Sequence, residues 1–269
     1  MLTSFSTQGK AIATDNAYRD IFAARVEDMY ERYKNHTSII MWSLGESSDN
    51  GVCMNAAYRL LKVLDRRRPV IFAGAGYGES TDIIGLPRAT IEQVRQYLSR
   101  KQSRPLLLMG YGASEGNSLG GLQPLWQQVE KNALVQGGFF CRWNDVVTVD
   151  GAGREHYAHG LLTSSGSVAP SVRQLAYIYR PFNVVLRSVS IDAADFSIAN
   201  RSDFATGDDL RLEYRLYTSL KPSIISGEVP NLPDAGGGKD FKLMIPKMTL
   251  YAGEELFVRF SLKRRSAAD

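Results

Sequence analysis

The pattern of apolar and polar positions changes character near Pro181. Before it, apolar residues recur at steps of three and four residues or in short unbroken runs, which indicate amphipathic helices and buried strands. After it, short segments alternate apolar and polar residues between Gly, Pro and Asp turns, which indicates strands with one face on a core. The pattern therefore predicts an α/β part followed by an all-β part.

The first part alternates expected strands with expected helices over short connections, which is typical of a parallel α/β fold. In the first helix, Tyr18, Phe22 and Val26 recur at four-residue steps. The expected helices are Asn16–Asn35, Val52–Leu64, Ile91–Ser99, Leu122–Asn132 and Gln174–Arg180, and the expected strands are Ser38–Leu44, Val70–Ala73, Asp82–Leu86, Leu106–Met109 and Gly138–Trp143.

The second part contains short expected strands whose spacing predicts a β-sandwich of immunoglobulin type. Leu210–Tyr217 and the run from Leu256 to Leu262 alternate strictly enough to face a core on one side and solvent on the other. The expected strands are Val184–Val189, Phe196–Asn200, Leu210–Tyr217, Ile224–Val229, Phe241–Ile245 and Glu255–Lys263.

Composition excludes several classes of protein. With 269 residues, 44% hydrophobic and 22% charged, the chain is an ordinary globular one. Its net charge of +4 is scattered, so no nucleic-acid partner is expected. No apolar run predicts a membrane span, and no secretory signal is visible, which favours a cytoplasmic location. Cys53 and Cys141 show no ligand spacing, so we expect free thiols, no metal and no cofactor.

The segment Lys34–Gly51, KNHTSIIMWSLGESSDNG, places a polar loop directly after an apolar strand. An α/β barrel carries its chemistry at such loops. The segment resembles the β-galactosidases of glycoside hydrolase family 2, whose matching stretch reads KNHPSIIMWSLGNESG. The resemblance implies that the Glu after Asn is the general acid/base. Here the Asn position holds Glu46 and the Glu position holds Ser47.

A second segment, Arg104–Gly121, RPLLLMGYGASEGNSLGG, resembles the family's RPLILCEYAHAMGNSLGG. The resemblance implies that the Glu in this stretch is the catalytic nucleophile, yet its position holds Gly110, and the His three residues later is Ala113. Retaining glycosidases need two carboxyl groups about 5–5.5 Å apart. Both catalytic positions are therefore substituted, while the flanking residues of both segments match.

The resemblance continues through Tyr58–Val70, Thr81–Gln93, Gly137–Asp145 and His156–Leu162, and more weakly at Ser6–Gly9. It implies that a sugar-stacking Trp is retained as Trp143, which is our candidate substrate-binding residue. Other implied sugar or metal contacts are replaced, so the substitutions fall on the chemistry and spare the packing. These replaced positions are Ser6, Gln8, Arg88, His156 and His159, and in the Gly137–Asp145 segment the family's first Trp and its Asp are replaced by Cys141 and Arg142.

The resemblance implies an α/β partial (β/α)8 TIM-type barrel over residues 1–182, followed by an all-β immunoglobulin-like sandwich over residues 183–269. Relative to the family, the chain is truncated at both ends, and about five strands of an eight-strand barrel remain. Open strand edges favour association. We therefore expect a homo-oligomer or a complementing protein subunit, with the contact near Ser38–Leu44 and Gly138–Trp143.

Other residues compete for a catalytic or metal role. Glu46 is the one substitute for the acid/base, if a shifted loop brings it to the site, but it restores one of two carboxylates. Glu115 is more simply a solvated loop carboxylate. His156 and His159 have a spacing that suits a metal only with a third ligand. The glycines of Gly74–Gly78 lack the Lys and Ser/Thr of a phosphate loop, and His36 is interpreted as structural.

Three functions remain open. The first is a β-galactosidase-like protein that is catalytically inactive and acts as a binding or assembly subunit, with weak carbohydrate binding at most. The alternative is a fragment or subunit of a split β-galactosidase that hydrolyses terminal β-galactosides in carbohydrate metabolism. The third is a decaying gene product without a selected role. Gly110 weighs against the second.

Overall fold

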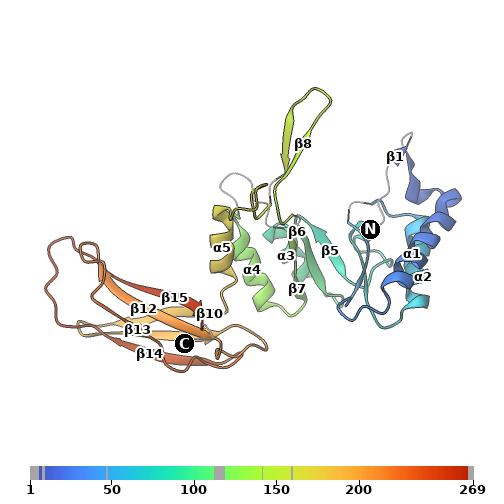
Figure 1. The fold of residues 1–269 in the computed structure, drawn as a ribbon. Coiled ribbons are helices and arrows are strands. Elements are labelled where there is room, and N and C mark those ends of the chain that lie inside the picture. Colours follow the sequence, from blue (N-terminus) through green and yellow to red (C-terminus); the bar gives the residue numbers. More distant parts are fainter. Residues whose placement is uncertain are drawn as a thin grey trace. The chain divides into compact units, whose positions relative to one another are not determined.

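The structure is a computed structural model that describes residues 6–7, 10–46, 48–111, 119–140, 142–158 and 160–265. The chain splits into two compact units, Met1–Ile178 and Tyr179–Asp269. The first unit mixes helices with strands, whereas the described elements of the second are all strands (Figure 1). No helix in the described ranges combines the length and the apolar content that crossing a membrane requires.

Five strands of the first unit lie side by side in chain order and run in parallel. Trp42 lies opposite Val70, and Leu106 lies between Ile84 and Val135. A parallel bridge from Ile71 to Ile83 connects the two groups of strands. The elements are β1 (Ser6–Thr7), β2 (Lys10–Ala11), η1 (Ile12–Thr14), η2 (Asn16–Tyr18), α1 (Arg19–Tyr33), β3 (Trp42–Gly45), α2 (Val52–Leu64), β4 (Val70–Phe72), η3 (Ala73–Ala75), β5 (Ile84–Pro87), α3 (Ile91–Ser99), β6 (Leu106–Tyr111), α4 (Leu122–Lys131), β7 (Val135–Phe140), β8 (Val146–Val149), β9 (Glu155–Ala158) and α5 (Pro170–Ile178).

Apolar clusters lie on both faces of the parallel strands, and β4 is buried on both. On one face, α1 and α2 pack against β3 and β4, and the α2 residues Met54 and Leu61 are fully buried there. On the other face, Ile71, Ile83 and Leu107 form a second apolar cluster. Because both faces of β4 are covered, all three of its residues are buried. This two-sided burial explains why the strands appear in the sequence as unbroken apolar runs.

Several elements differ from the sequence-based expectation. The strand expected at 138–143 is β7, which ends at Phe140, so Trp143 lies beyond it. The strand expected at 38–44 begins only at Trp42, after a turn in which the His36 amide donates to the Tyr33 carbonyl. Helix α5 begins at Pro170, a residue favoured at the first helical position. The antiparallel hairpin β8–β9 was not expected and projects from the strands of its unit (Figure 1).

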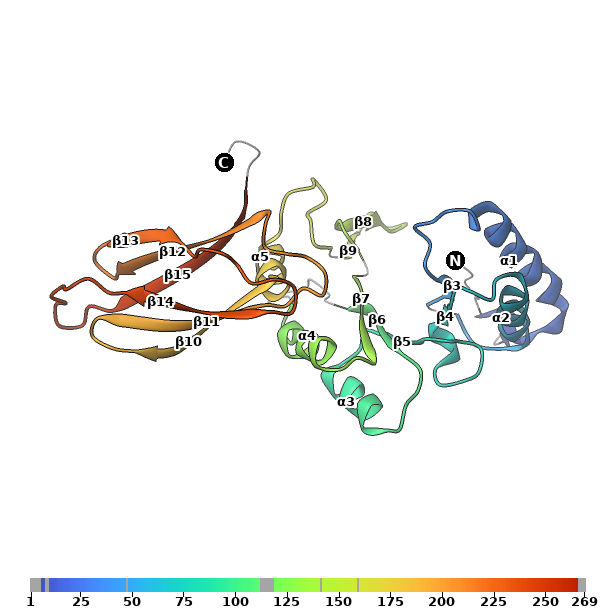
Figure 2. The ribbon, with the colours of Figure 1, turned by 90° about the horizontal axis from the view of Figure 1, so that it is seen from below.

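The second unit consists of two three-stranded antiparallel sheets, ordered β10–β11–β14 and β13–β12–β15. Figure 2 shows them as two layers. Alternate residues of β12, such as Leu212 and Leu216, are buried between the sheets, where Ile198 of β11 and Leu243 of β14 meet them. The strands are β10 (Phe182–Val189), β11 (Ala193–Asn200), β12 (Leu210–Thr218), β13 (Ile225–Glu228), β14 (Gly238–Met244) and β15 (Leu256–Arg264).

Candidate functional site

The carboxyl ends of the parallel strands carry most of the residues that the sequence singles out. Glu46 follows the last residue of β3, Arg88 follows the last residue of β5, and Gly110 lies near the end of β6. Trp143 lies just beyond β7. Strands β5, β6 and β7 are neighbours and run in parallel, so their carboxyl ends lie side by side. Those ends bring together Arg88, Gly110 and the start of the segment that leads to Trp143.

The backbone at Gly110 has a φ of 58°, in the left-handed region that glycine adopts without strain. On the neighbouring strand, Arg88 has a φ of 48°, and its amide donates to the Met109 carbonyl at 2.8 Å. A non-glycine residue in this region costs about 1–2 kcal/mol. The position that the resemblance assigns to the nucleophile therefore has no side chain, and an exposed, strained arginine flanks it.

Glu46 is half-buried at the end of β3 and is the only one of the acid/base candidates that the structure describes. Ser47 lies outside the described residues. So do the other candidates at Gln8, Ala113, Glu115, Cys141 and His159, while Ser6 lies in β1.

Trp143 has an exposed ring on an anchored backbone. Its side chain is 66% exposed, whereas its carbonyl accepts hydrogen bonds from the amides of Leu161 (2.9 Å) and Leu162 (2.8 Å). Next to it, the Asp145 carboxylate accepts the Gly160 amide at 2.7 Å. An aromatic face open to solvent can stack on the apolar face of a sugar ring.

The described histidines are engaged in local structure. His156 lies on β9, with its Nε2 3.1 Å from the Asp150 carboxylate, which also pairs with Arg154 at 2.9 Å. The backbone amide of Arg154 and the His156 ring lower the pKa of Asp150. The ring of His36 packs near Tyr33, with 5.7 Å between centroids. Across the residues that the structure describes, no three His, Cys, Asp or Glu side chains gather as a metal site would require.

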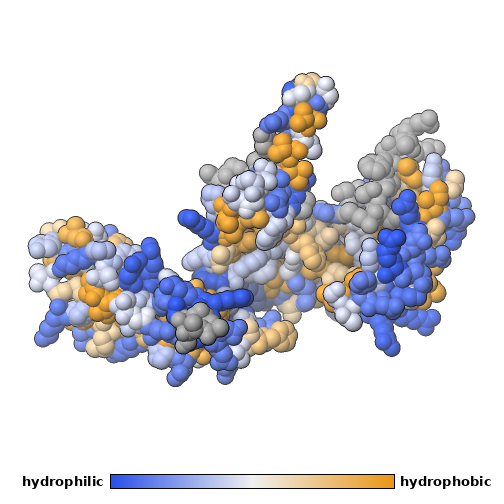
Figure 3. Space-filling view, in the orientation of Figure 1, coloured by the Kyte–Doolittle hydropathy of each residue, from blue (hydrophilic) through white to orange (hydrophobic). Residues whose placement is uncertain are grey.

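The β8–β9 hairpin presents apolar side chains to solvent. Val146 and Val149 of β8 are 45% and 62% exposed, and Figure 3 shows apolar atoms along the projecting hairpin. Because valine side chains are aliphatic, they supply no group for acid/base or nucleophilic chemistry.

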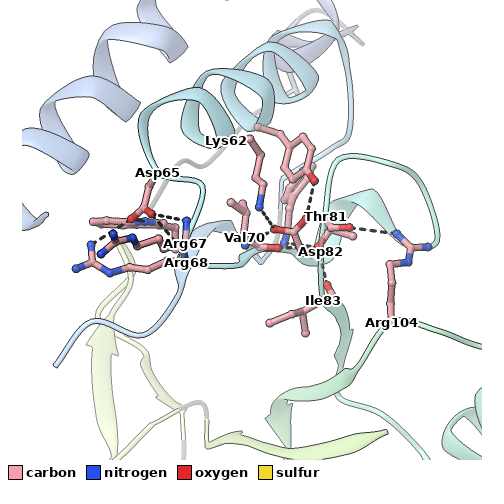
Figure 4. Close-up of polar contacts among 12 residues, drawn as sticks. Lys62, Asp65, Arg67, Arg68, Val70, Thr81, Asp82, Ile83 and Arg104 are labelled. Atoms are coloured by element: carbon pink, nitrogen blue, oxygen red, sulfur yellow. Dashed lines mark hydrogen bonds and ion pairs between the residues drawn. The ribbon is translucent and has the colours of Figure 1, made fainter. Parts of the chain in front are cut away.

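At the opposite, amino ends of the strands, Asp82 joins three segments (Figure 4). Its carboxylate accepts hydrogen bonds from the Tyr58 hydroxyl (2.7 Å), the Lys62 ammonium (2.9 Å) and the Val70 amide (2.8 Å). Burial raises the pKa of Asp82, but these three donors outweigh burial and the net pKa is lowered. Burial and Asp82 raise the pKa of Tyr58 to about 12.

A second carboxylate, Asp65, caps the loop that enters β4. It accepts the Trp42 indole N–H and the Arg67 amide, both at 2.9 Å, and the Arg68 amide at 3.2 Å. No sequence motif singles out Asp65 or Asp82. Residues at the amino ends of barrel strands serve stability rather than catalysis, and these contacts match that role.

The glycine-rich stretch 74–78 is a structural loop. The Arg104 guanidinium donates to the carbonyls of Tyr77 (2.7 Å), Gly78 (2.6 Å) and Thr81 (3.2 Å). A Cβ on Gly74 would lie 2.1 Å from the Ser48 carbonyl oxygen, so close backbone approach requires this glycine.

The comparisons with known proteins agree with this geometry. The family model for the TIM barrel domain of glycosyl hydrolases family 2 matches residues 2–161, more than half of the chain. The parallel strands and their helices are therefore part of a TIM-barrel fold, the class of protein that carries its site at the carboxyl ends of such strands. The chain belongs to glycoside hydrolase family 2 and is β-galactosidase-like.

Relatives with the name β-galactosidase match most of the chain. The protein from Leuconostoc mesenteroides is 29% identical over 240 residues, which are 77% of this chain and 23% of that protein. The protein from Oenococcus oeni is 32% identical over 238 residues, which are 76% of this chain and 23% of that protein. The protein from Lactococcus lactis is 28% identical over 94% of this chain and 28% of that protein. This chain spans about a quarter of the length of these curated relatives.

Solved structures share the fold at low identity. A β-glucuronidase from Bacteroides uniformis aligns with 97% of this chain and 37% of its own, at 14% identity and a TM-score of 0.50. A putative β-galactosidase from Bacteroides fragilis aligns with 84% of this chain and 43% of its own, at 13% identity and a TM-score of 0.50.

Proposed function

We propose that this chain is a catalytically inactive β-galactosidase-like protein that acts as a folded binding or assembly subunit. The observation that carries the proposal is Gly110, a residue without a side chain at the position that we assign to the nucleophile. Ser47 at the acid/base position removes the second carboxyl group. A retaining mechanism requires both groups, whereas the cores on both faces of the strands are intact.

The alternative is a fragment or subunit of a split β-galactosidase whose catalytic groups come from another segment. Glu46, at the carboxyl end of β3, favours this alternative because it lies one residue from the acid/base position. It would supply one of the two carboxylates, so another segment would have to supply the nucleophile.

We also propose that residues 1–182 form the barrel domain and residues 183–269 an immunoglobulin-like domain. The two packed antiparallel sheets of the second unit support the immunoglobulin-like assignment.

The edges of the five parallel strands support assembly. In the described ranges, β3 pairs only with β4, and β7 pairs only with β6, so each outer edge presents backbone groups without a strand partner. We propose that further barrel strands cover these edges, supplied by a second copy, by another polypeptide or by more of the same chain. Stable interfaces bury about 1,200–2,000 Å² in total, which a missing part of a barrel can supply.

Sedimentation velocity of the 29.8 kDa chain at low micromolar concentration tests the assembly proposal. We expect a species larger than a monomer, or a monomer that binds a dye for exposed apolar surface, since uncovered strands leave such surface accessible. A compact monomer without dye binding would contradict the proposal.

Sugar binding is expected to be weak and to depend on Trp143. Titration of galactose or lactose, followed by Trp fluorescence and by calorimetry, should give dissociation constants above the millimolar range. Because Trp143→Ala also removes the reporting indole, calorimetry measures its binding, which should be lost since stacking is the main contact left. The matched control is Trp126→Phe, which replaces another indole but keeps an aromatic ring beside Tyr111, whose ring centroid lies 6.5 Å from that of Trp126. Submillimolar binding that survives Trp143→Ala would show that another site binds the sugar.

A further inference from the structure

The outward face of the sheet β13–β12–β15 contains a shallow groove of about 610 Å³. All three strands contribute to it, with charged side chains from Glu213, Arg215, Glu228, Arg259 and Lys263. The groove belongs wholly to the second unit and shares no residue with the sugar-site candidates of the first.

Two arginines at one end of this groove lie directly opposite each other, Arg215 on β12 and Arg259 on β15. Both guanidinium groups lie 5.8 Å from the centroid of the Tyr217 ring. That ring stacks on Phe257, with 5.4 Å between centroids and 24° between planes. Like charges directly opposite on neighbouring strands destabilise a sheet, so this pair needs a compensating contact.

The carboxylates of the groove are already used by other cations. Glu213 pairs with Arg211 at 3.2 Å and with Lys263 at 2.7 Å, and Glu228 pairs with Arg265 at 2.5 Å. Neither Arg215 nor Arg259 forms an ion pair within the described part of the chain, and both side chains are exposed. The uncompensated charge of the groove is therefore positive and confined to these two arginines beside an aromatic pair.

We propose that this face binds an acidic polypeptide segment, with a carboxylate held between Arg215 and Arg259 and an apolar side chain on Tyr217 and Phe257. Arginine binds carboxylates with two parallel hydrogen bonds, so two opposed guanidinium groups form a carboxylate clamp. The ring contacts hold both guanidinium groups in place before the partner arrives. A polypeptide fits because it can present an acidic and an apolar side chain at the spacing of the cationic and aromatic ends.

Other partners fit this face less well. A nucleic acid carries negative charge along its whole backbone, so its phosphates would meet Glu213 and Glu228 further along the groove. A neutral sugar can stack on the aromatic ring and accept hydrogen bonds from the arginines, but it brings no negative charge to compensate the two cations. The groove carries both positive and negative side chains, which favours a partner whose charge also varies along its length.

Fluorescence anisotropy of the full chain with a short labelled peptide of alternating Glu and Phe tests the proposal. We expect it to bind at least tenfold more tightly than the same peptide with Gln for Glu, because hydrogen bonds to charged groups contribute about 1.5–3 kcal/mol. Arg215→Gln and Arg259→Gln should each weaken binding about tenfold while keeping the aliphatic stem.

The matched control is Arg187→Gln, which changes an exposed arginine on β10 of the other sheet and should leave binding unchanged. Thermal unfolding of each variant checks folding, and removing one of two opposed cations should not lower the midpoint. Equal binding of the Gln peptide, equal loss with Arg187→Gln, tighter binding of a single-stranded oligonucleotide, or no peptide binding in the millimolar range would overturn the proposal.

Discussion

The purified chain is expected to hydrolyse an aryl β-galactoside no faster than buffer alone. Glycine at position 110 provides no nucleophile, and serine at position 47 cannot donate a proton as a carboxylic acid does. Removing catalytic groups that act as a unit lowers kcat by about four to six orders of magnitude. Four orders correspond to about 5.4 kcal/mol of barrier. Release of the chromophore, followed at high enzyme concentration for many hours, measures this rate.

If any turnover is detected, Glu46→Gln tests whether it comes from the Glu46 carboxylate or from a contaminating enzyme. A rate equal to buffer in both proteins fits the inactive subunit. Robust turnover that disappears in Glu46→Gln would contradict it and would show that the shifted carboxylate acts as the acid/base. Turnover that survives Glu46→Gln would reveal a contaminating enzyme, which Trp143→Ala checks because a contaminant would not respond to it.

Asp82→Ala is expected to lower the free energy of unfolding of the first unit by about 1–3 kcal/mol, because it leaves partly buried donors without their acceptor. The substitution leaves the Tyr58 hydroxyl, the Lys62 ammonium and the Val70 amide without their shared acceptor. Urea unfolding at neutral pH, followed by circular dichroism, measures the loss. The control is Glu31→Ala, which removes an exposed partner of Lys34 and should cost at most about 0.5 kcal/mol. A similar loss in both variants would contradict a special role for Asp82.

The pH dependence of unfolding should identify the same network. The folded-state pKa of Asp82 is lowered, so its contribution is present above the unfolded pKa of about 3.9 and is lost as the pH falls through the folded value. The folded-state pKa of Tyr58 is about 12, raised from 10.0, so its contribution is present below pH 10 and is lost as the pH rises towards 12. Asp82→Ala should flatten the stability profile at both ends. If Asp82→Ala leaves the pH dependence of the unfolding free energy unchanged, groups other than Asp82 and Tyr58 determine that dependence.

The sequence pattern predicted helices more accurately than strand ends. The bounds of α2 and α3 agree with expectation because each has a clear apolar stripe, and α3 starts with a Thr90–Gln93 capping box. The start of β7 was wrong, because the pattern placed it at Gly138 whereas the strand begins at Val135. A Cβ on Gly138 would lie 2.3 Å from the Leu108 carbonyl oxygen, so this glycine lies inside the strand where its backbone closely approaches the neighbouring strand. This contact between strands is a tertiary one, and no local sequence pattern encodes it.

The candidate site was predictable only as far as motifs reach. Glu46 and Gly110 lie at strand ends, where the motifs place them, whereas Trp143 lies beyond the end of β7 rather than in the strand. The Asp82 network was not predictable because its partners Tyr58 and Lys62 are 24 and 20 residues away in the chain. The arginine pair of the second unit likewise depends on strand register, which brings positions 215 and 259 together.

The left-handed backbone at Gly110 also bears on whether catalysis can return during evolution. A single base change converts two of the four glycine codons into a glutamate codon and the other two into an aspartate codon, so a carboxylate at position 110 is one mutation away in the gene. The φ of 58° makes that mutation cost about 1–2 kcal/mol in backbone strain. A revertant would thus lose stability and would still lack the acid/base until position 47 changed as well. Selection would meet the cost of the first step before any benefit of the second, which would make the loss of activity that we propose hard to reverse.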